Sequence, residues 1–115
     1  MQFELTKQFL SDVSHAVSEK DSLFIIKNVN ELHPADIAEI MDYVNLQEAQ
    51  YIYQLLDEEQ AADVLVEIDE DVRDKFLASL SAKEIAESIE NMDSDDAADL
   101  IQDLPEKKQE EVLSE

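Results

Sequence analysis

Two rows of acidic residues are the part of this sequence best suited to bind a ligand. Three acids recur at every fourth position between residues 59 and 67, and three more between residues 95 and 103. The six are Glu59, Asp63, Glu67, Asp95, Asp99 and Asp103. At this spacing the carboxylates of each row share one face of a helix, where like charges repel by roughly a few tenths of a kcal/mol per pair. A cation would relieve that repulsion, and an all-oxygen ligand set favours a hard ion, Mg²⁺ or Ca²⁺.

Helix capping does not account for the two rows. Several other acids stand just before an expected helix or in its first turn, where a cap or the helix dipole favours them. Asp63 and Asp99 fall in mid-helix, where aspartate has poor propensity and no cap to make. Neither row has a basic residue interleaved, whereas Asp71 is followed four residues later by Lys75. Bound cations are one interpretation of the rows, and fully solvated carboxylates are the other.

A 12-residue repeat predicts the helices that carry these rows. Seven segments of 12 residues run from residue 32 to residue 115 without insertion, and each begins with an apolar residue. The second residue is a good helix N-cap in five segments, namely Asn45, Asp57, Asp69, Ser81 and Asp93. Capping boxes are expected in three units, from Asn45 to Glu48, Asp57 to Gln60 and Ser81 to Glu84. Each unit is therefore predicted to be a turn followed by a short helix.

Helices of about two turns are too short to be stable alone, so the units must stack on one another. This predicts an all-α solenoid without strands. Its helices are expected to begin near Pro34, Leu46, Glu58, Glu70, Ala82, Ser94 and Glu106. The expected core comprises Leu56, Val64, Leu65, Ile68, Phe76, Leu77, Leu80, Ile85, Ile89, Met92, Leu100 and Ile101. The tyrosines at positions 43, 51 and 53 are expected to pack with their hydroxyls at the surface.

Residues 1–31 precede the repeat and are predicted to form two N-terminal capping helices. The first is amphipathic, carries an apolar stripe between about Phe3 and Glu19, and is expected to start near Thr6 or earlier. The second is capped by Asp21 or Ser22 and continues to about Val29. Together with the seven-unit solenoid of residues 32–115, these helices are expected to form one domain, because 115 residues suffice for a single core.

Composition narrows the possible functions. The chain has no cysteine and no glycine, which excludes disulfides, thiolate chemistry and glycine-rich phosphate-binding loops. Its net charge of −22 would repel nucleic acid and attract cations or basic proteins. The apolar runs are far shorter than the roughly 20 residues of a membrane-spanning helix, so no insertion of this chain into a membrane is expected. Two isolated histidines and no nucleophile beside a base indicate a protein that is not an enzyme.

Three segments carry a resemblance to a known family. They are residues 32–39 (LHPADIAE), 61–65 (AADVL) and 92–100 (MDSDDAADL). In this order they resemble the cytosolic N-terminal domain of the MgtE family of magnesium transporters, and the similarity covers nearly the whole chain. The resemblance implies a right-handed superhelix of short helices. It also implies a pair of CBS domains and a dimeric membrane pore, which are absent from this sequence.

The resemblance also implies a function and a site. In the family, Mg²⁺ bound between this domain and the CBS domains holds the pore closed when intracellular magnesium is plentiful. The acids of the family motifs that face this interface correspond to Asp63, Asp95 and Asp99. This implies a cytosolic Mg²⁺-sensing regulatory domain at the cytoplasmic face of the membrane, with the CBS domains of the same transporter as its partner. Without that partner each site lacks half of its ligands, so Mg²⁺ is expected to bind the isolated domain weakly or not at all.

Two alternatives remain open on the sequence. One is a protein-interaction solenoid resembling the helical repeat domains of the flagellar rotor protein FliG, which would not require aspartates at the mid-helix positions 63 and 99. The other is an ordinary acidic domain adapted to high salt, in which carboxylates would be spread evenly over the surface rather than gathered in two rows.

Overall fold

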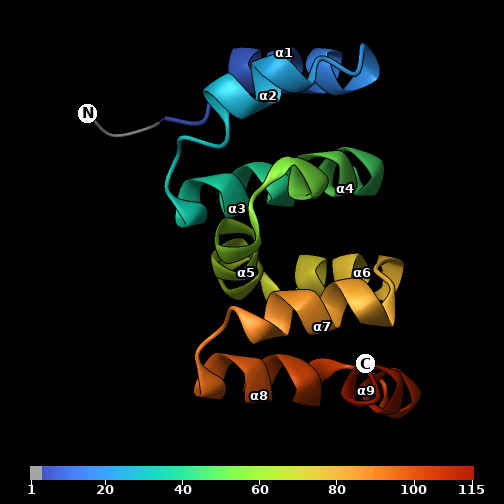
Figure 1. Ribbon diagram of the computed structural model, residues 1–115. Coiled ribbons are helices and arrows are strands. Elements are labelled where there is room, and N and C mark those ends of the chain that lie inside the picture. The colour runs from blue at the N-terminus through green and yellow to red at the C-terminus, as the bar shows by residue number, and fades with distance from the viewer. Residues whose placement is uncertain (1–3) are drawn as a thin grey trace.

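The computed structural model describes residues 4–115, which form nine helices and no strand (Figure 1). The all-α class is therefore confirmed. The helices are α1 (Lys7–Ser18), α2 (Ser22–Asn28), α3 (Pro34–Tyr43), α4 (Leu46–Leu55), α5 (Glu58–Glu67), α6 (Glu70–Ser79), α7 (Ala82–Glu90), α8 (Ser94–Asp103) and α9 (Glu106–Leu113). Among these described residues, no helix is long and apolar enough to cross a membrane.

The seven helices from α3 to α9 begin at the residues that the sequence predicted. Most of them end on the apolar residue that opens the next 12-residue unit, and this residue has an extended backbone. Leu56, for example, has a ψ of 150° and Leu80 a ψ of 151°. A chain without glycine lacks the residue that most readily adopts the left-handed C-cap. It ends these helices through an extended residue instead, and the following cap residue starts the next helix.

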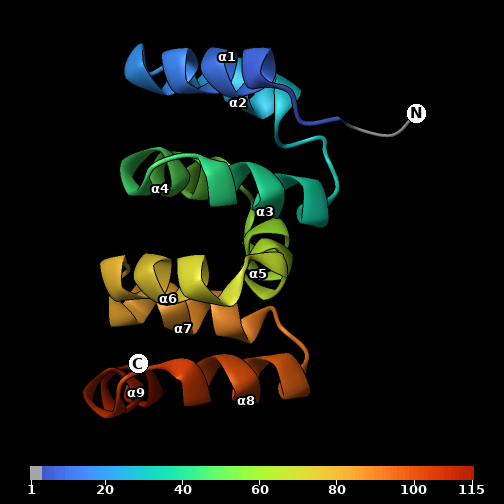
Figure 2. The same ribbon diagram turned by 180° about the vertical axis from the view of Figure 1, so that it is seen from behind.

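The helices are stacked in chain order along the longest dimension of a molecule that measures 41 × 28 × 23 Å (Figures 1 and 2). The cap helices α1 and α2 lie at one end, and α8 and α9 lie at the other. The first helix, α1, packs on α2 and α4. Along one side of the stack, each helix packs mainly against the helix two places along the chain: α3 contacts α5, α5 contacts α7, and α7 contacts α9. The same holds on the other side of the stack for α2, α4 and α6.

The core lies along the inside of this stack. Most of the expected core is confirmed as buried: Leu56, Val64, Leu65, Ile68, Phe76, Leu77, Leu80, Ile85 and Leu100. Three expected core residues, Ile89, Met92 and Ile101, are half-buried instead. All three lie toward the C-terminal end of the chain. Ile101 lies on α8, which with α9 forms the last layer, and no further layer of the described chain covers that layer.

The N-terminal helices pack onto α4 and are tied to the rest of the stack by hydrogen bonds. The Asn30 side-chain amide donates to the carbonyl of Leu55 at 2.8 Å, and the Gln60 side-chain amide donates to the carbonyl of Asn30. The first helix begins at Lys7 with Thr6 as its N-cap, as expected, and the Thr6 hydroxyl accepts from the Phe9 amide. Phe3, where the expected apolar stripe begins, lies outside the described residues.

The expected capping is confirmed in part. Complete capping boxes are present at Asn45 with Glu48 and at Ser81 with Glu84. Asp57 accepts from the backbone amide of Gln60 at 2.7 Å, but the Gln60 side chain binds Asn30 and so does not complete the box. Asp69 and Asp93 stand at the N-cap position as expected, but neither side chain accepts a capping hydrogen bond.

Asp57 accepts a capping hydrogen bond and Asp93 does not, so substitution by alanine should have different effects at the two positions. Asp57→Ala should lower the free energy of unfolding by about 0.5–2 kcal/mol, because it leaves the Gln60 amide without its acceptor. Asp93→Ala is the matched control and should cost less than about 0.5 kcal/mol, since no capping bond is lost. Urea titrations at high salt, which screens the change in charge, measure both values. Equal losses in the two variants would contradict the assignment.

Candidate functional site

The first acidic row lies on the outer face of α5. The opposite face of this helix is buried through Ala61, Ala62, Val64 and Leu65, and this burial turns Glu59, Asp63 and Glu67 outward, where all three are exposed. Two of them, with the capping residue at position 57, line a shallow depression of about 200 Å³ beside the start of α3. The carboxylates of this row therefore face solvent from one side of α5.

The second acidic row lies on α8, and one of its members is paired. Asp95 and Asp99 are exposed, as in the first row. Asp103 accepts a hydrogen bond from Arg73 of α6, with 2.9 Å between the guanidinium nitrogen and the carboxylate oxygen. The two side chains are only 17% and 31% exposed, so water screens this pair less than a fully exposed ion pair.

This pairing corrects two expectations. The second row was expected to be uncompensated, and Arg73 neutralises its last member. Conversely, Asp71 and Lys75 were expected to pair along α6, yet the Arg73–Asp103 contact is the only ion pair in residues 4–115. Arg73 reaches across the stack to α8, where its partner Asp103 lies 30 residues away in the sequence. Spacing along one helix does not reveal such a contact.

The two rows form separate patches, because α7 lies between α5 and α8 in both views (Figures 1 and 2). Within the described residues, no three acidic or histidine side chains are placed to hold a metal ion together. The candidate residues Asp63, Asp95 and Asp99 therefore do not converge on one point. Each patch offers carboxylates from one side, and a hard cation there would take its remaining oxygen ligands from water or from a second surface.

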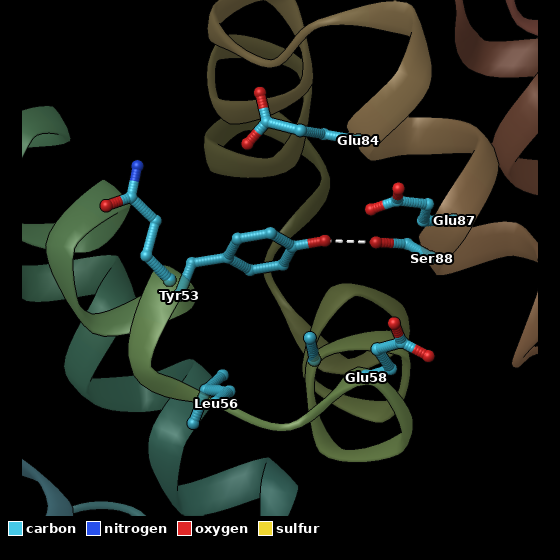
Figure 3. A pocket seen from close by; sticks show the side chains of 8 residues that line it. Tyr53, Leu56, Glu58, Glu84, Glu87 and Ser88 are labelled. Atoms are coloured by element: carbon cyan, nitrogen blue, oxygen red, sulfur yellow. Dashed lines mark hydrogen bonds between the residues drawn. The ribbon is translucent and has the colours of Figure 1, made fainter.

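A buried hydroxyl pair joins two layers of the stack and was not expected. Tyr53 of α4 and Ser88 of α7 form a hydrogen bond across a pocket of about 230 Å³ (Figure 3). Tyr53 is only 7% exposed, so the expectation of a surface hydroxyl is wrong for this residue. Burial raises the pKa of the Tyr53 hydroxyl, and the charges of Glu84 and Glu87 raise it further against the opposing effect of the Ser88 hydrogen bond.

A second unexpected feature is Asp42 at the end of α3. Its carboxylate accepts from the backbone amide of Asp69 at 3.4 Å, which links α3 to the start of α6. Burial raises the pKa of Asp42, and repulsion from Asp69 and Glu39 adds to this, whereas the backbone hydrogen bond lowers it. No sequence motif marks this residue, because its partner lies 27 residues away.

Comparison with family models gives a match over most of the chain. The model of the family described as MgtE intracellular N domain matches residues 32–115, which begin at the first residue of the first 12-residue unit. The resemblance noted in the sequence is thereby confirmed. A search of curated proteins found no match.

Proposed function

This chain belongs to the MgtE intracellular N domain family, and on that premise we propose that it is the Mg²⁺-sensing regulatory domain of a magnesium transporter. It acts at the cytoplasmic face of the membrane as part of a longer protein. Its partner is the pair of CBS domains of the same transporter, and its regulatory cofactor is Mg²⁺. It is a binding domain, with no catalytic role and no affinity for nucleic acid.

The observation that supports this function best is the exposure of three unpaired aspartates. Asp63, Asp95 and Asp99 are all exposed and form no ion pair with any described residue. All three lie in the segment that matches the family. An acidic surface of this kind repels a second acidic surface when both are bare, and bridging divalent cations cancel the repulsion.

Such bridging supplies a gating mechanism. Mg²⁺ that binds between two docked surfaces stabilises the docked state, because the separated surfaces each provide too few ligands. A rise in intracellular Mg²⁺ then shifts the population toward the docked arrangement, which holds the pore closed. When Mg²⁺ falls, repulsion separates the surfaces and the pore opens. Alone, the domain binds Mg²⁺ weakly for the same reason.

The proposal extends to the fold. The stack of helices is a right-handed superhelical solenoid built on the 12-residue repeat of residues 32–115, and residues 1–31 form its N-terminal cap. The regular helix starts and the packing of α3 on α5, α5 on α7 and α7 on α9 support this description. A solenoid suits the mechanism because it presents the acids of α5 and α8 at separate levels of an elongated stack.

Limited proteolysis of the intact transporter tests the mechanism. We expect Mg²⁺ to protect the linker that follows this domain in the wild type, and to protect it less in Asp63→Ala, Asp95→Ala and Asp99→Ala. The variants should also keep the pore open at higher intracellular Mg²⁺. Asp71→Ala is the matched control, since Asp71 is an exposed aspartate on α6 outside both rows.

The outcomes separate the candidate functions. Equal protection of all four variants and the wild type would remove the three aspartates from the mechanism and leave the rows as solvated surface. Protection that appears without Mg²⁺ would favour a protein-interaction solenoid resembling those of FliG.

A further inference from the structure

The pocket between α4, α5 and α7 has an apolar wall with acidic side chains around it (Figure 3). Tyr53, Leu56 and Ala61 supply its apolar wall, and Glu58, Glu84 and Glu87 stand around it. From this arrangement we infer that the pocket receives an arginine side chain from a partner protein. The inference goes beyond the proposed function, because it needs no Mg²⁺ and uses none of the three aspartates on the acidic rows.

The size of the pocket favours a single side chain. Its volume of about 230 Å³ lies below the roughly 300–1,000 Å³ typical of small-molecule and cofactor sites. An arginine has an apolar stem that can lie along Leu56 and Ala61 while its charged end remains among polar groups. The planar guanidinium also stacks favourably on an aromatic ring such as that of Tyr53.

The charge of the pocket is complementary to a cation. None of the described residues that line it is basic, and none of its three glutamates forms an ion pair with a described residue. One carboxylate oxygen of Glu84 accepts from the backbone amide of Ser81 at 3.1 Å, so the capping box holds this side chain in place. Burial is the main cause of the raised pKa of the Tyr53 hydroxyl, and the charges of Glu84 and Glu87 add to it.

The buried hydroxyls supply further acceptors. Tyr53 and Ser88 are 7% and 5% exposed, and each hydroxyl bonds to the other. A hydroxyl oxygen has two acceptor lone pairs, so one hydrogen bond between the two leaves acceptor capacity unused. A guanidinium carries five N–H donors and no acceptor, which matches a site made of carboxylates and hydroxyl oxygens.

A metal ion fits the pocket less well. The three carboxylates come from two helices and surround the apolar wall, and no three acidic groups of the described chain are placed to hold one ion. Mg²⁺ demands near-octahedral oxygen ligands at short range. An extended, planar cation can instead reach carboxylates that stand apart.

Titration of the ¹⁵N-labelled chain with acetyl-arginine N-methylamide in Mg²⁺-free buffer tests the inference. We expect saturable shifts of the backbone amides of Gln54, Ala61 and Ser88. Acetyl-citrulline N-methylamide is the neutral isostere and should not produce them. Glu58→Gln and Glu87→Gln should each raise the Kd about threefold or more, as expected for loss of a partly exposed ion pair. Glu90→Gln, an exposed glutamate of α7 outside the pocket, should leave the Kd unchanged.

Several results would overturn the inference. Equal shifts with the citrulline probe would show that charge is not recognised, and shifts spread over both acidic rows without saturation would show diffuse attraction. Displacement of the arginine probe by equimolar Mg²⁺ would assign the pocket to a metal ion, and an equal Kd for acetyl-lysine N-methylamide would assign it to cations in general. The Asp63, Asp95 and Asp99 variants should bind the arginine probe as the wild type does, so this inference and the proposed gating mechanism can fail separately.

Discussion

Replacing Leu77 by alanine is expected to lower the free energy of unfolding by about 2–5 kcal/mol. Leu77 lies on α6 and is 1% exposed, so the substitution leaves a cavity in the centre of the stack. A chain of 115 residues is expected to have a total stability of about 6–17 kcal/mol at roughly 0.05–0.15 kcal/mol per residue. Truncation of the single Leu77 side chain should therefore remove a substantial fraction of the total free energy of unfolding.

A urea titration measures this loss, and Leu113→Ala is its matched control. Leu113 ends α9 and is 69% exposed, so the same change there should cost less than about 0.5 kcal/mol. A loss below about 0.5 kcal/mol for Leu77→Ala would mean that α6 does not pack as the structure shows.

Removal of residues 1–31 is expected to have a still larger effect. This deletion takes away α1 and α2, whose side chains Val13 and Ile25 are 0% exposed, and it uncovers the surface of α4 on which both helices pack. Repeat proteins depend on terminal caps to shield their last apolar face. The shortened chain should unfold at a much lower urea concentration than the Leu77→Ala variant and should bind a hydrophobic dye such as ANS.

The full-length Asn30→Ala variant separates packing from hydrogen bonding in this experiment. It removes the bond from the Asn30 side chain to the Leu55 carbonyl but keeps both helices. Its loss should be far smaller than that of the deletion. A fragment of residues 32–115 that unfolds at the same urea concentration as the full chain would show that the first 31 residues are a separate unit.

The helix starts could be predicted from the sequence because their causes are local. A cap such as Asn45 and its box partner Glu48 lie three residues apart, and the helix between them needs no distant contact to begin. The outward direction of the acidic rows was predictable for a similar reason. The buried residues Val64 and Leu65 lie on the face of α5 opposite Asp63, and periodicity alone reveals that arrangement.

The contacts between layers could not be predicted, because they join residues that are far apart in the chain. Arg73 pairs with Asp103 rather than with an acid on its own helix, and Tyr53 finds Ser88 at a separation of 35 residues. Gln60 has the spacing of a capping-box residue, but its side chain binds Asn30 instead. In each case the packing of the layers brings the two partners together. The separation of the two acidic rows by α7 follows from the same packing.

Three of the polar contacts between layers, here called ties, also have a mechanical consequence. The Asn30 amide is joined to Leu55, the Tyr53 hydroxyl to Ser88, and Arg73 to Asp103, so the ties overlap along the chain from the loop after α2 to the end of α8. A pull on the last helices relative to the first must extend these bonds together with the apolar contacts between layers. Hydrogen bonds weaken steeply with small changes in length and angle, whereas apolar contacts can slide. The stack should therefore resist deformation at low load and yield abruptly once a tie breaks. Such behaviour suits a domain that transmits displacement from one end to the other.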